Sequence, residues 1–143
     1  MQHYTQKLIP DATYHVYNRA NGNEKLFRTP DNYRFFISKY NQYISGIADT
    51  WCYCLMPNHF HFLIRVKGEK ELSKHFCEEN LHQKAIETLL WRQFSNFFNS
   101  YSKAFNKEHN RKGNLFMRTF KRKRIDDLQY FNNLIFYIHC NPI

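Results

Sequence analysis

The stretch Leu-Met-Pro-Asn-His-Phe-His-Phe-Leu-Ile-Arg-Val, residues 55–66, decides how the chain is organised. Pro57 and Asn58 are typical of a tight turn, and from His59 onward the residues alternate as in a strand. We therefore predict a strand that is buried from behind and holds the two imidazoles of His59 and His61 side by side in front. Its two faces carry His59, His61, Leu63 and Arg65 in front, and Phe60, Phe62, Ile64 and Val66 behind.

Two imidazoles on one face of a strand form a two-point grip for a metal ion. A His-x-His pair alone also fits a simpler interpretation, in which an alternating strand carries two polar residues on its wetter face. Cys52 and Cys54 alternate on the preceding strand and extend the first interpretation to zinc, although structural zinc sites favour Cys-x-x-Cys. The metal hypothesis therefore depends on other residues of the chain.

Strand and helix signals flank this stretch on both sides. Thr29 and Pro30 are typical of a helix start, a hydroxyl cap followed by proline at the first helical position. Asp126 and Asp127 place negative charge at the start of a last helix. The predicted elements, in chain order, are a strand at 13–18, a helix from Pro30 until Gly46, a strand at 51–55, the strand from His59, a partly helical segment at 69–83, a helix at 86–105 that Gly113 ends, a strand at 115–125 and the last helix, which Pro142 stops.

Apolar residues at helical spacing mark the buried faces of the last two helices. These residues are Ile86, Leu90, Phe94, Phe97, Tyr101 and Phe105 in the longer helix, and Leu128, Phe131, Ile135 and Ile138 in the last. The order of elements builds an antiparallel sheet backed by helices. We therefore predict an α+β fold of ferredoxin-like (RRM-like) type with an appended C-terminal helix, formed by residues 1–143 as one domain.

The composition favours a polyanionic partner. The net charge is +9 and aromatic residues make up 18% of the chain, more than a core of this size usually needs, so some rings should be exposed. No apolar run approaches the length of a membrane span and no signal-peptide pattern opens the chain, so nucleic acid is a better candidate than a membrane. The irregularly spaced cysteines do not form a disulfide framework and indicate a reducing cytoplasm.

The strongest charge signal lies between residues 111 and 124, where basic residues recur without an acid among them. One interpretation is a solvated edge strand that lysine protects against aggregation. The interleaved Phe116 and Phe120 instead favour a surface that tracks a nucleic-acid backbone and stacks unpaired bases. Arg19 and Asn21 supply further polar contacts if the loop after the first strand borders the site. The basic residues are Arg111, Lys112, Arg118, Lys121, Arg122, Lys123 and Arg124.

Tyr137 and Asn141 project from one face of the last helix, because they are four residues apart and lie off its apolar stripe. Alone, the tyrosine fits a packing residue with a surface hydroxyl, and the asparagine fits a helix C-terminal residue before proline. Beside His59 and His61 they suggest more, because two imidazoles and an amide oxygen leave metal positions open and a phenol one turn away can attack a metal-bound phosphate. No general base is evident, because His139 lies about 200° around the helix from Tyr137.

Four motifs, in their order and spacing, resemble the single-tyrosine HUH transposases, and among them the REP-associated tyrosine transposases. The motifs are Tyr14-His15-Val16-Tyr17-Asn18-Arg19, Met56-Pro57-Asn58-His59-Phe60-His61, Arg111-Lys112-Gly113-Asn114-Leu115-Phe116 and Tyr137-Ile138-His139-Cys140-Asn141-Pro142. The resemblance covers essentially the whole chain, although residues 69–85 hold no counterpart motif. His-hydrophobe-His is a weak motif alone, whereas its combination with Tyr-x-x-x-Asn-Pro is specific.

The resemblance implies that His59, His61 and Asn141 are metal ligands and that Tyr137, on the appended helix, is the nucleophile. In that family the tyrosine attacks single-stranded DNA, keeps the 5′ phosphate as a phosphotyrosine and releases a 3′ hydroxyl. The resemblance also implies Mg or Mn as the cofactor, although imidazole generally suits zinc, copper or manganese better than magnesium. The implied partner is single-stranded or hairpin DNA, bound by a homodimer or a monomer.

Two other functions fit the same sequence. A ferredoxin-like sheet that displays aromatic side chains also binds bases in non-catalytic RRM modules. A metal-independent ribonuclease on a similar fold uses histidine as acid and base. Only the transposase hypothesis predicts a covalent link between protein and DNA, so trapping of an adduct separates the three.

Overall fold

The alternating stretch around His59 and His61 forms a strand inside a four-stranded antiparallel sheet. The computed structural model describes residues 5–140. The sheet order is β2-β3-β1-β4, so the histidine strand β3 and its neighbour β1 are both interior strands. The elements are β1 (Thr13–Arg19), α1 (Pro30–Ile44), β2 (Ala48–Met56), β3 (His59–Val66), α2 (Glu69–Phe76), α3 (Gln83–Glu108), β4 (Lys121–Arg124) and α4 (Leu128–Cys140).

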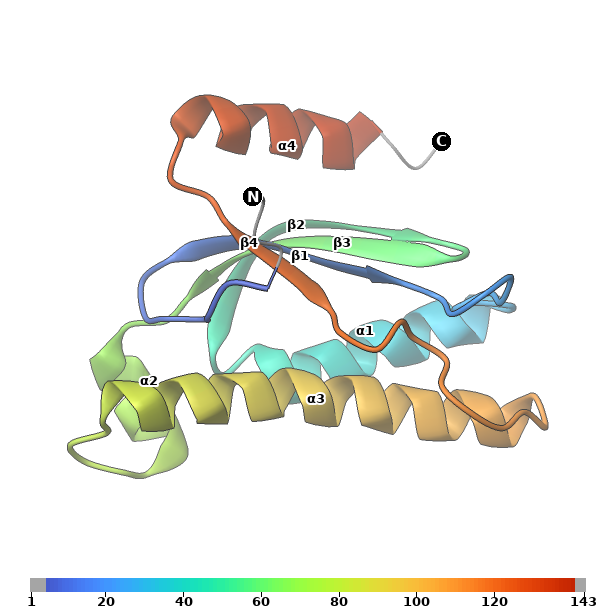
Figure 1. The fold of residues 1–143 in the computed structure, drawn as a ribbon, viewed down its shortest axis with the longest axis horizontal. Helices are drawn as coiled ribbons and strands as arrows, with labels where there is room; N and C mark the ends of the chain where they lie inside the picture. The colour runs from blue at the N-terminus through green and yellow to red at the C-terminus, as the bar shows by residue number, and fades with distance from the viewer. Residues whose placement is uncertain (1–4, 141–143) are drawn as a thin grey trace.

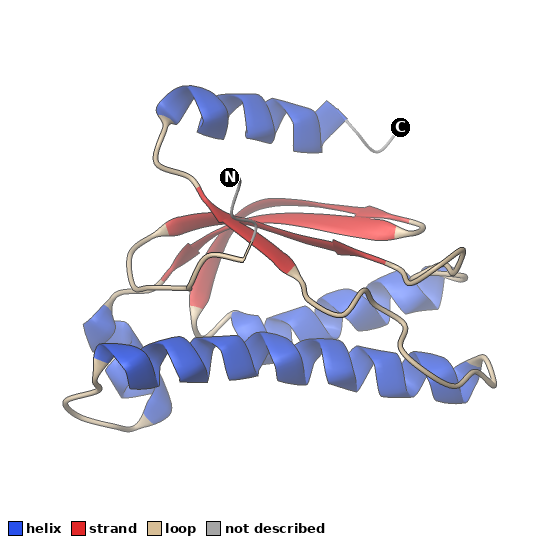
Figure 2. Ribbon diagram, viewed as in Figure 1, coloured by secondary structure: helices blue, strands red, loops and turns tan. Residues whose placement is uncertain are grey.

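The sheet separates two unequal layers of helix (Figures 1 and 2). α1 and α3 cover one face of the sheet, and α4 lies alone over the other. The larger core forms on the side of α1 and α3, where the Phe36 ring packs against Phe62 and Phe97. A smaller core beneath α4 includes Leu63 and Ile138. This architecture confirms the predicted α+β fold, an antiparallel sheet backed by helices with an appended C-terminal helix.

β3 divides its side chains between the two layers as the alternation predicts. Phe60 and Phe62 are buried in the larger core. His59 and His61 point to the other face and are only partly buried. Leu63, farther along the histidine face, is buried in the core beneath α4. The strand is therefore anchored from behind along its length, and the histidines occupy the less covered end of its front face.

α1 begins where Thr29 and Pro30 predict. The Thr29 hydroxyl accepts a hydrogen bond from the backbone N–H of Asn32, and the Asn32 side chain accepts one from the backbone N–H of Thr29. This reciprocal cap satisfies two backbone donors that would otherwise lack partners. The buried Asn32 amide also donates to Glu108 at the end of α3. The cap therefore ties the start of α1 to the end of α3.

β2 spans Ala48–Met56 and is therefore longer than the strand predicted at 51–55. A register shift between Thr50 and Cys52 interrupts the alternation on which the sequence-based prediction relied. The polar Asp49 pairs with Arg65 in the β2–β3 ladder, and its carboxylate lies 3.0 Å from the Arg65 guanidinium. The first part of β2 therefore contains polar residues, and alternation alone does not predict it as a strand.

The segment predicted as a strand at 115–125 pairs as a strand only at Lys121–Arg124. One isolated bridge joins Phe116 to Ala20 nearer the start of the segment. Between these two pairings the backbone leaves the ladder, because the rings of Phe116 and Phe120 both turn toward α3 and contact Phe98. The prediction of one continuous strand was wrong, because packing against α3 replaced pairing with β1.

The last two helices also differ in detail from their predicted forms. α3 ends at Glu108, and Gly113, with φ of 90°, serves the loop beyond it and does not end the helix. In α4 the predicted core residue Leu128 is 73% exposed, whereas Leu134 is buried. α4 contacts the sheet mainly through β2, and Leu134 and Ile138 make that contact from its later turns. None of the helices within residues 5–140 has the length and apolar character needed to cross a bilayer.

Candidate functional site

The site begins with His59 and His61 on β3. In the β1–β3 ladder His61 lies opposite Tyr17, and His59 lies opposite Arg19. The two imidazole rings are 5.1 Å apart between centroids and nearly perpendicular, at 86°. Because the backbone of an interior strand is held by hydrogen bonds on both sides, this pair of rings is presented from a rigid support.

Each of these rings is oriented through its Nδ1 atom. The Nδ1 of His59 lies 2.7 Å from Oδ1 of Asn58, in the turn before the strand. The Nδ1 of His61 lies 2.8 Å from Nε2 of His15 on β1. Both contacts leave Nε2 as the free ring position among the described residues. Metal-binding histidines are commonly oriented in this way, with one ring nitrogen on a polar partner and the other on the ion.

His15 is a member of the site that the sequence reasoning did not identify. The alternation of β1 placed His15 and Tyr17 on one face, and their rings stack at 4.3 Å. His15 is buried, and its contact with His61 depends on the cross-strand register, in which the two residues are diagonal neighbours. Pairing His15 with His61 from the sequence would have required the register between the strands at 13–18 and 59–66 to be predicted.

The environment lowers the pKa of all three imidazoles. Burial lowers the pKa of His59. Burial and then the neighbouring His59 lower the pKa of His61 to about 4. Burial, followed by His61 and Lys123, lowers the pKa of His15 to about 3. Neutral imidazole is the form that coordinates a metal ion, so the environment keeps the two β3 histidines ready to act as ligands near neutral pH.

α4 brings Tyr137 to the same place. The ring of Tyr137 lies 5.8 Å from the ring of His61, at an interplanar angle of 90°. Tyr137 is 49% exposed, so its ring is neither part of the core nor free of the sheet. The structure therefore places side by side two residues that are far apart in the sequence and that the sequence analysis linked. Asn141, the predicted third ligand, lies outside the described residues.

The described side chains at the site supply some, but not all, of the ligands that a metal ion needs. Two neutral imidazoles with oriented Nδ1 atoms supply two nitrogen ligands. Within residues 5–140 no group of three or more His, Cys, Asp or Glu side chains could hold a metal ion. The described His, Cys, Asp and Glu side chains therefore do not by themselves complete a ligand set at His59 and His61. Cys52 and Cys54 are buried in the core beneath α4, and burial raises the pKa of both thiols, which does not favour the zinc alternative.

A pocket of about 230 Å³ opens beside the histidines. Two of the predicted DNA-binding residues, Arg19 and Lys121, line it from the end of β1 and the start of β4. The pocket thus lies between the imidazole pair and two residues whose side chains carry positive charge. Its lining residues are Tyr17, Asn18, Arg19, His59, His61, Met117 and Lys121.

Two of the predicted DNA-binding arginines are engaged within the protein. Arg111 donates to Glu24 at 2.8 Å and to the carbonyl oxygen of Asn114 at 3.0 Å. Arg122 donates to the carbonyl oxygens of Gln6 and Phe120, at 2.9 and 3.1 Å. These guanidinium groups hold the 111–124 segment against its neighbours, and the predicted DNA contacts of Arg111 and Arg122 stay a prediction.

The predicted stacking platforms Phe116 and Phe120 are buried, with 8% and 5% of their surface exposed, so their rings do not form an exposed stacking surface. The exposed members of the basic run are Lys112, Arg118 and Arg124, and Arg124 pairs with Asp126 at 3.0 Å. Lys121 and Lys123 are partly buried. The backbone N–H of Asn21 bonds to Leu115, and its side chain is exposed.

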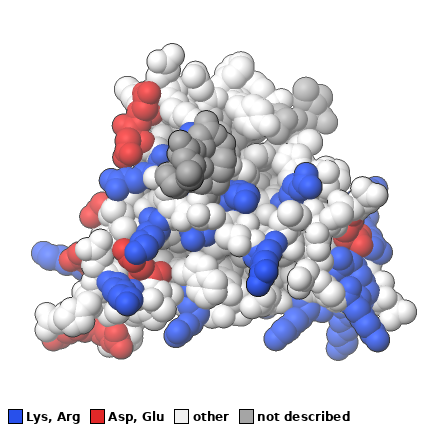
Figure 3. Space-filling view, in the orientation of Figure 1, with Lys and Arg blue, Asp and Glu red and all other residues white. Residues whose placement is uncertain are grey.

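Basic side chains nevertheless dominate part of the surface. Figure 3 shows Lys and Arg across the middle and lower right of the face seen in Figure 1, whereas Asp and Glu gather mainly at its left. The excess of basic over acidic side chains on this face agrees with the net charge of +9. A basic face of this kind attracts polyanions over distances beyond direct contact.

Comparison with known proteins identifies a shared fold. The sequence matches no known family model and no curated protein. A solved structure similar to this chain is that of a REP-associated tyrosine transposase bound to a REP hairpin. The TM-score is 0.63, the match covers 99% of this chain and 73% of the transposase chain, and 13% of aligned residues are identical. The two proteins are therefore distant structural relatives.

Proposed function

We propose that the protein is a metal-dependent single-stranded DNA endonuclease and strand transferase that acts through a 5′-phosphotyrosine intermediate. The observation that carries the proposal is the position of the Tyr137 ring, 5.8 Å from the ring of His61, on the sheet face that presents two oriented imidazoles. The fold shared with a transposase that was solved with a hairpin supports a DNA substrate. Arg19 and Lys121, which lie beside the histidines, supply positive charge near the proposed site.

In the proposed reaction the phenol oxygen of Tyr137 attacks the phosphorus of one phosphodiester. The new oxygen–phosphorus bond replaces the bond to the 3′ oxygen, which leaves and becomes a 3′ hydroxyl by taking a proton. The energy of the phosphodiester is kept in the phosphotyrosine, so a second 3′ hydroxyl can attack it and rejoin strands without a nucleotide cofactor. α4 orients the phenol, and Arg19 with Lys121 binds the phosphate backbone.

His59 and His61 are the proposed protein ligands of a divalent cation, Mg or Mn, with Asn141 as the proposed third ligand. A bound cation would supply charge neutralisation at the phosphate, because a phenol, with an ordinary pKa of about 10, is a poor nucleophile at neutral pH. Asn58 and His15 are proposed to hold the two rings with Nε2 toward the ion. The donor set suits a cation that keeps water molecules in its remaining positions.

The two alternative functions lose support for separate reasons. α4 lies over one face of the sheet, where its Tyr137 contacts His61, whereas an RRM leaves its sheet open for stacking bases. A histidine-based ribonuclease needs a protonated imidazole as its acid. The pKa of His61 is lowered to about 4 and that of His15 to about 3, so both are poor proton donors near pH 7.

Covalent trapping tests the proposal. Incubation of the protein with hairpin-forming single strands and Mn²⁺ should give an adduct that survives denaturation, with the mass of the protein plus a 3′ fragment joined through its 5′ phosphate. Tyr137→Phe should abolish the adduct, because only the attacking oxygen is removed. Tyr130→Phe is the matched control on the same helix and should leave the adduct yield unchanged. An adduct that persists in Tyr137→Phe would contradict the assignment of the nucleophile.

A further inference from the structure

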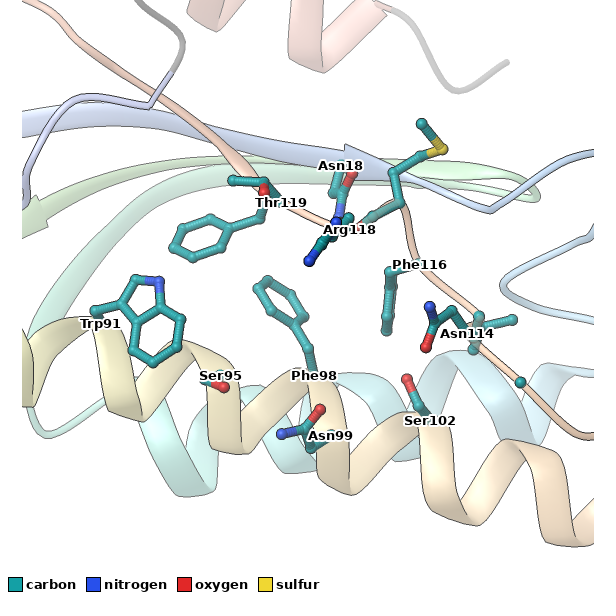
Figure 4. A pocket seen from close by; sticks show the side chains of 14 residues that line it. Asn18, Trp91, Ser95, Phe98, Asn99, Ser102, Asn114, Phe116, Arg118 and Thr119 are labelled. Atoms are coloured by element: carbon teal, nitrogen blue, oxygen red, sulfur yellow. The ribbon is translucent and has the colours of Figure 1, made fainter.

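A second and larger pocket, of about 430 Å³, lies between α3 and the segment 113–120 (Figure 4). The α3 wall is built from residues three or four positions apart, which places them on one stripe of the helix. This stripe combines an indole that is half exposed with hydroxyl and amide groups. It consists of Trp91, Ser95, Phe98, Asn99 and Ser102.

The opposite wall comes from the segment that leaves the β-ladder before β4. Asn114, Arg118 and Thr119 supply an amide, a guanidinium and a hydroxyl to this wall, and Figure 4 shows Asn114 facing the α3 side near Ser102. The rings of Phe116 and Phe120 form an apolar floor. No Asp or Glu is among the lining residues. The pocket therefore offers hydrogen-bonding groups of both kinds, an aromatic surface and positive charge.

The pocket adjoins the candidate active site across the edge of the sheet. Asn18 and Met117 line both pockets, and the Asn18 amide donates to the carbonyl oxygen of Met117 at 3.0 Å. This bond fixes the short piece of chain that separates the two pockets. The two pockets are therefore neighbours, separated by the segment that includes Met117.

We propose that this second pocket binds an unpaired nucleobase of the single-stranded DNA substrate. The inference rests on the proposed function, and it adds a site for a base that takes no part in the chemistry. Trp91 provides the stacking surface, Asn99 and Asn114 bond to the base edge, and Arg118 binds the adjacent phosphate. Aromatic stacking holds any base, whereas amide groups bond in a pattern that differs between bases. The pocket thus selects one base near the cleavage position.

The indole of Trp91 allows a direct test. The chain has two tryptophans, so Trp51→Phe leaves Trp91 as the single indole fluorophore. In that background, Tyr137→Phe and chelation of divalent metal prevent cleavage during the measurement. Titration with single-stranded oligo(dA), oligo(dC) and oligo(dT) should quench Trp91 fluorescence to saturation, and the binding constant should differ between the three. Duplex DNA of the same length should not quench it.

Substitutions assign the contacts. Trp91→Ala should weaken binding of the preferred oligonucleotide about tenfold in an anisotropy assay, the loss expected for one stacked base. Asn99→Ala and Asn114→Ala should reduce the difference between the three oligonucleotides. Ser95→Leu narrows the pocket and should abolish the quenching while Trp91 remains. Asn41→Ala, an exposed amide on α1, is the matched control and should change neither result.

The outcomes separate this site from the proposed chemistry. Quenching without any adduct in the parent protein would retain the base pocket and refute the transferase. An adduct without quenching, or quenching that survives Ser95→Leu and is equal for the three oligonucleotides, would refute the base pocket and retain the transferase. Absence of binding to all single strands would refute both.

Discussion

At the scale of single residues, the hydrogen bond between His15 and His61 decides which nitrogen of His61 can bind a metal ion. If Nδ1 of His61 donates its proton to Nε2 of His15, then Nε2 of His61 keeps its lone pair for the metal. If His15 donates instead, Nε2 of His61 carries the proton and cannot coordinate. His15 is buried and its ring contacts those of Tyr17 and His61. We propose that it is the acceptor, and thereby a positioning residue for His61.

Removal of the acceptor should weaken metal binding. His15→Phe fills a similar volume but accepts no hydrogen bond, so we expect Mn²⁺ affinity, measured by calorimetry without DNA, to fall about 10- to 100-fold. His15→Gln restores a carbonyl oxygen and should recover most of the affinity. Equal losses in both variants, or none in His15→Phe, would show that the contact does not position His61.

The ligands themselves should separate chemistry from binding. His59→Ala, His61→Ala and Asn141→Ala should each abolish metal-dependent adduct formation. The affinity for single-stranded DNA, measured by anisotropy, should remain within a few-fold of the parent value, because the basic surface supplies most of the binding. Normal cleavage by Asn141→Ala would assign the third ligand elsewhere.

At the scale of elements, the 111–124 segment shows what sequence patterns can and cannot predict. The sequence shows that the segment is strongly basic, but it does not show which guanidinium groups form hydrogen bonds within the protein. Arg122 is buried enough that its pKa is lowered, and its bonds to Gln6 and Phe120 join β4 to the chain before β1. Lys121 instead lines the histidine pocket. Neighbours in the basic run therefore have different roles.

Two substitutions in this run should have opposite effects. Lys121→Ser removes a phosphate contact and should lower the slope of log affinity against log salt by roughly 0.7, with little change in thermal stability. Arg122→Ser removes a partly buried donor to two carbonyl groups and should lower the free energy of unfolding by about 1–3 kcal/mol without changing the slope. The measurements are salt titrations of DNA affinity and thermal melts. A slope unchanged by Lys121→Ser would move the DNA path away from β4.

The same segment explains why the fold was predictable and part of the site was not. Three local patterns were sufficient to predict the fold: the alternation of β3, the cap of α1 and the apolar stripe of α3. They were sufficient because each element buries its apolar face against the sheet or the helices. Phe116 and Phe120 were misread because a pattern within one segment does not reveal that α3 lies beside it. His15 was missed for a related reason, since its contact with His61 exists only once two strands are in register.

At the scale of the whole molecule, the two cores have different sizes and different roles. The core between the sheet, α1 and α3 contains most of the large buried rings. The core beneath α4 is a small cluster that includes Cys54, Leu63, Leu134 and Ile138. α4 connects to the rest of the fold mainly through β2. The helix that carries the proposed nucleophile is therefore attached by a minor share of the burial energy and should open at a lower free energy than the main core.

Leu134→Ala tests this difference in attachment. Leu134 is buried in the small core one turn before Ile138, and its truncation should cost about 2–5 kcal/mol where it packs. We expect amide exchange in α4 to accelerate at least tenfold and the adduct yield of Tyr137 to fall, while exchange in α3 and affinity for single-stranded DNA change little. Leu90→Ala, the matched truncation in the main core, should instead accelerate exchange in both helices. If Leu134→Ala accelerated exchange in α3 as much as in α4, α4 would belong to the same cooperative unit as the sheet, and the position of Tyr137 beside His61 would be as stable as the fold itself.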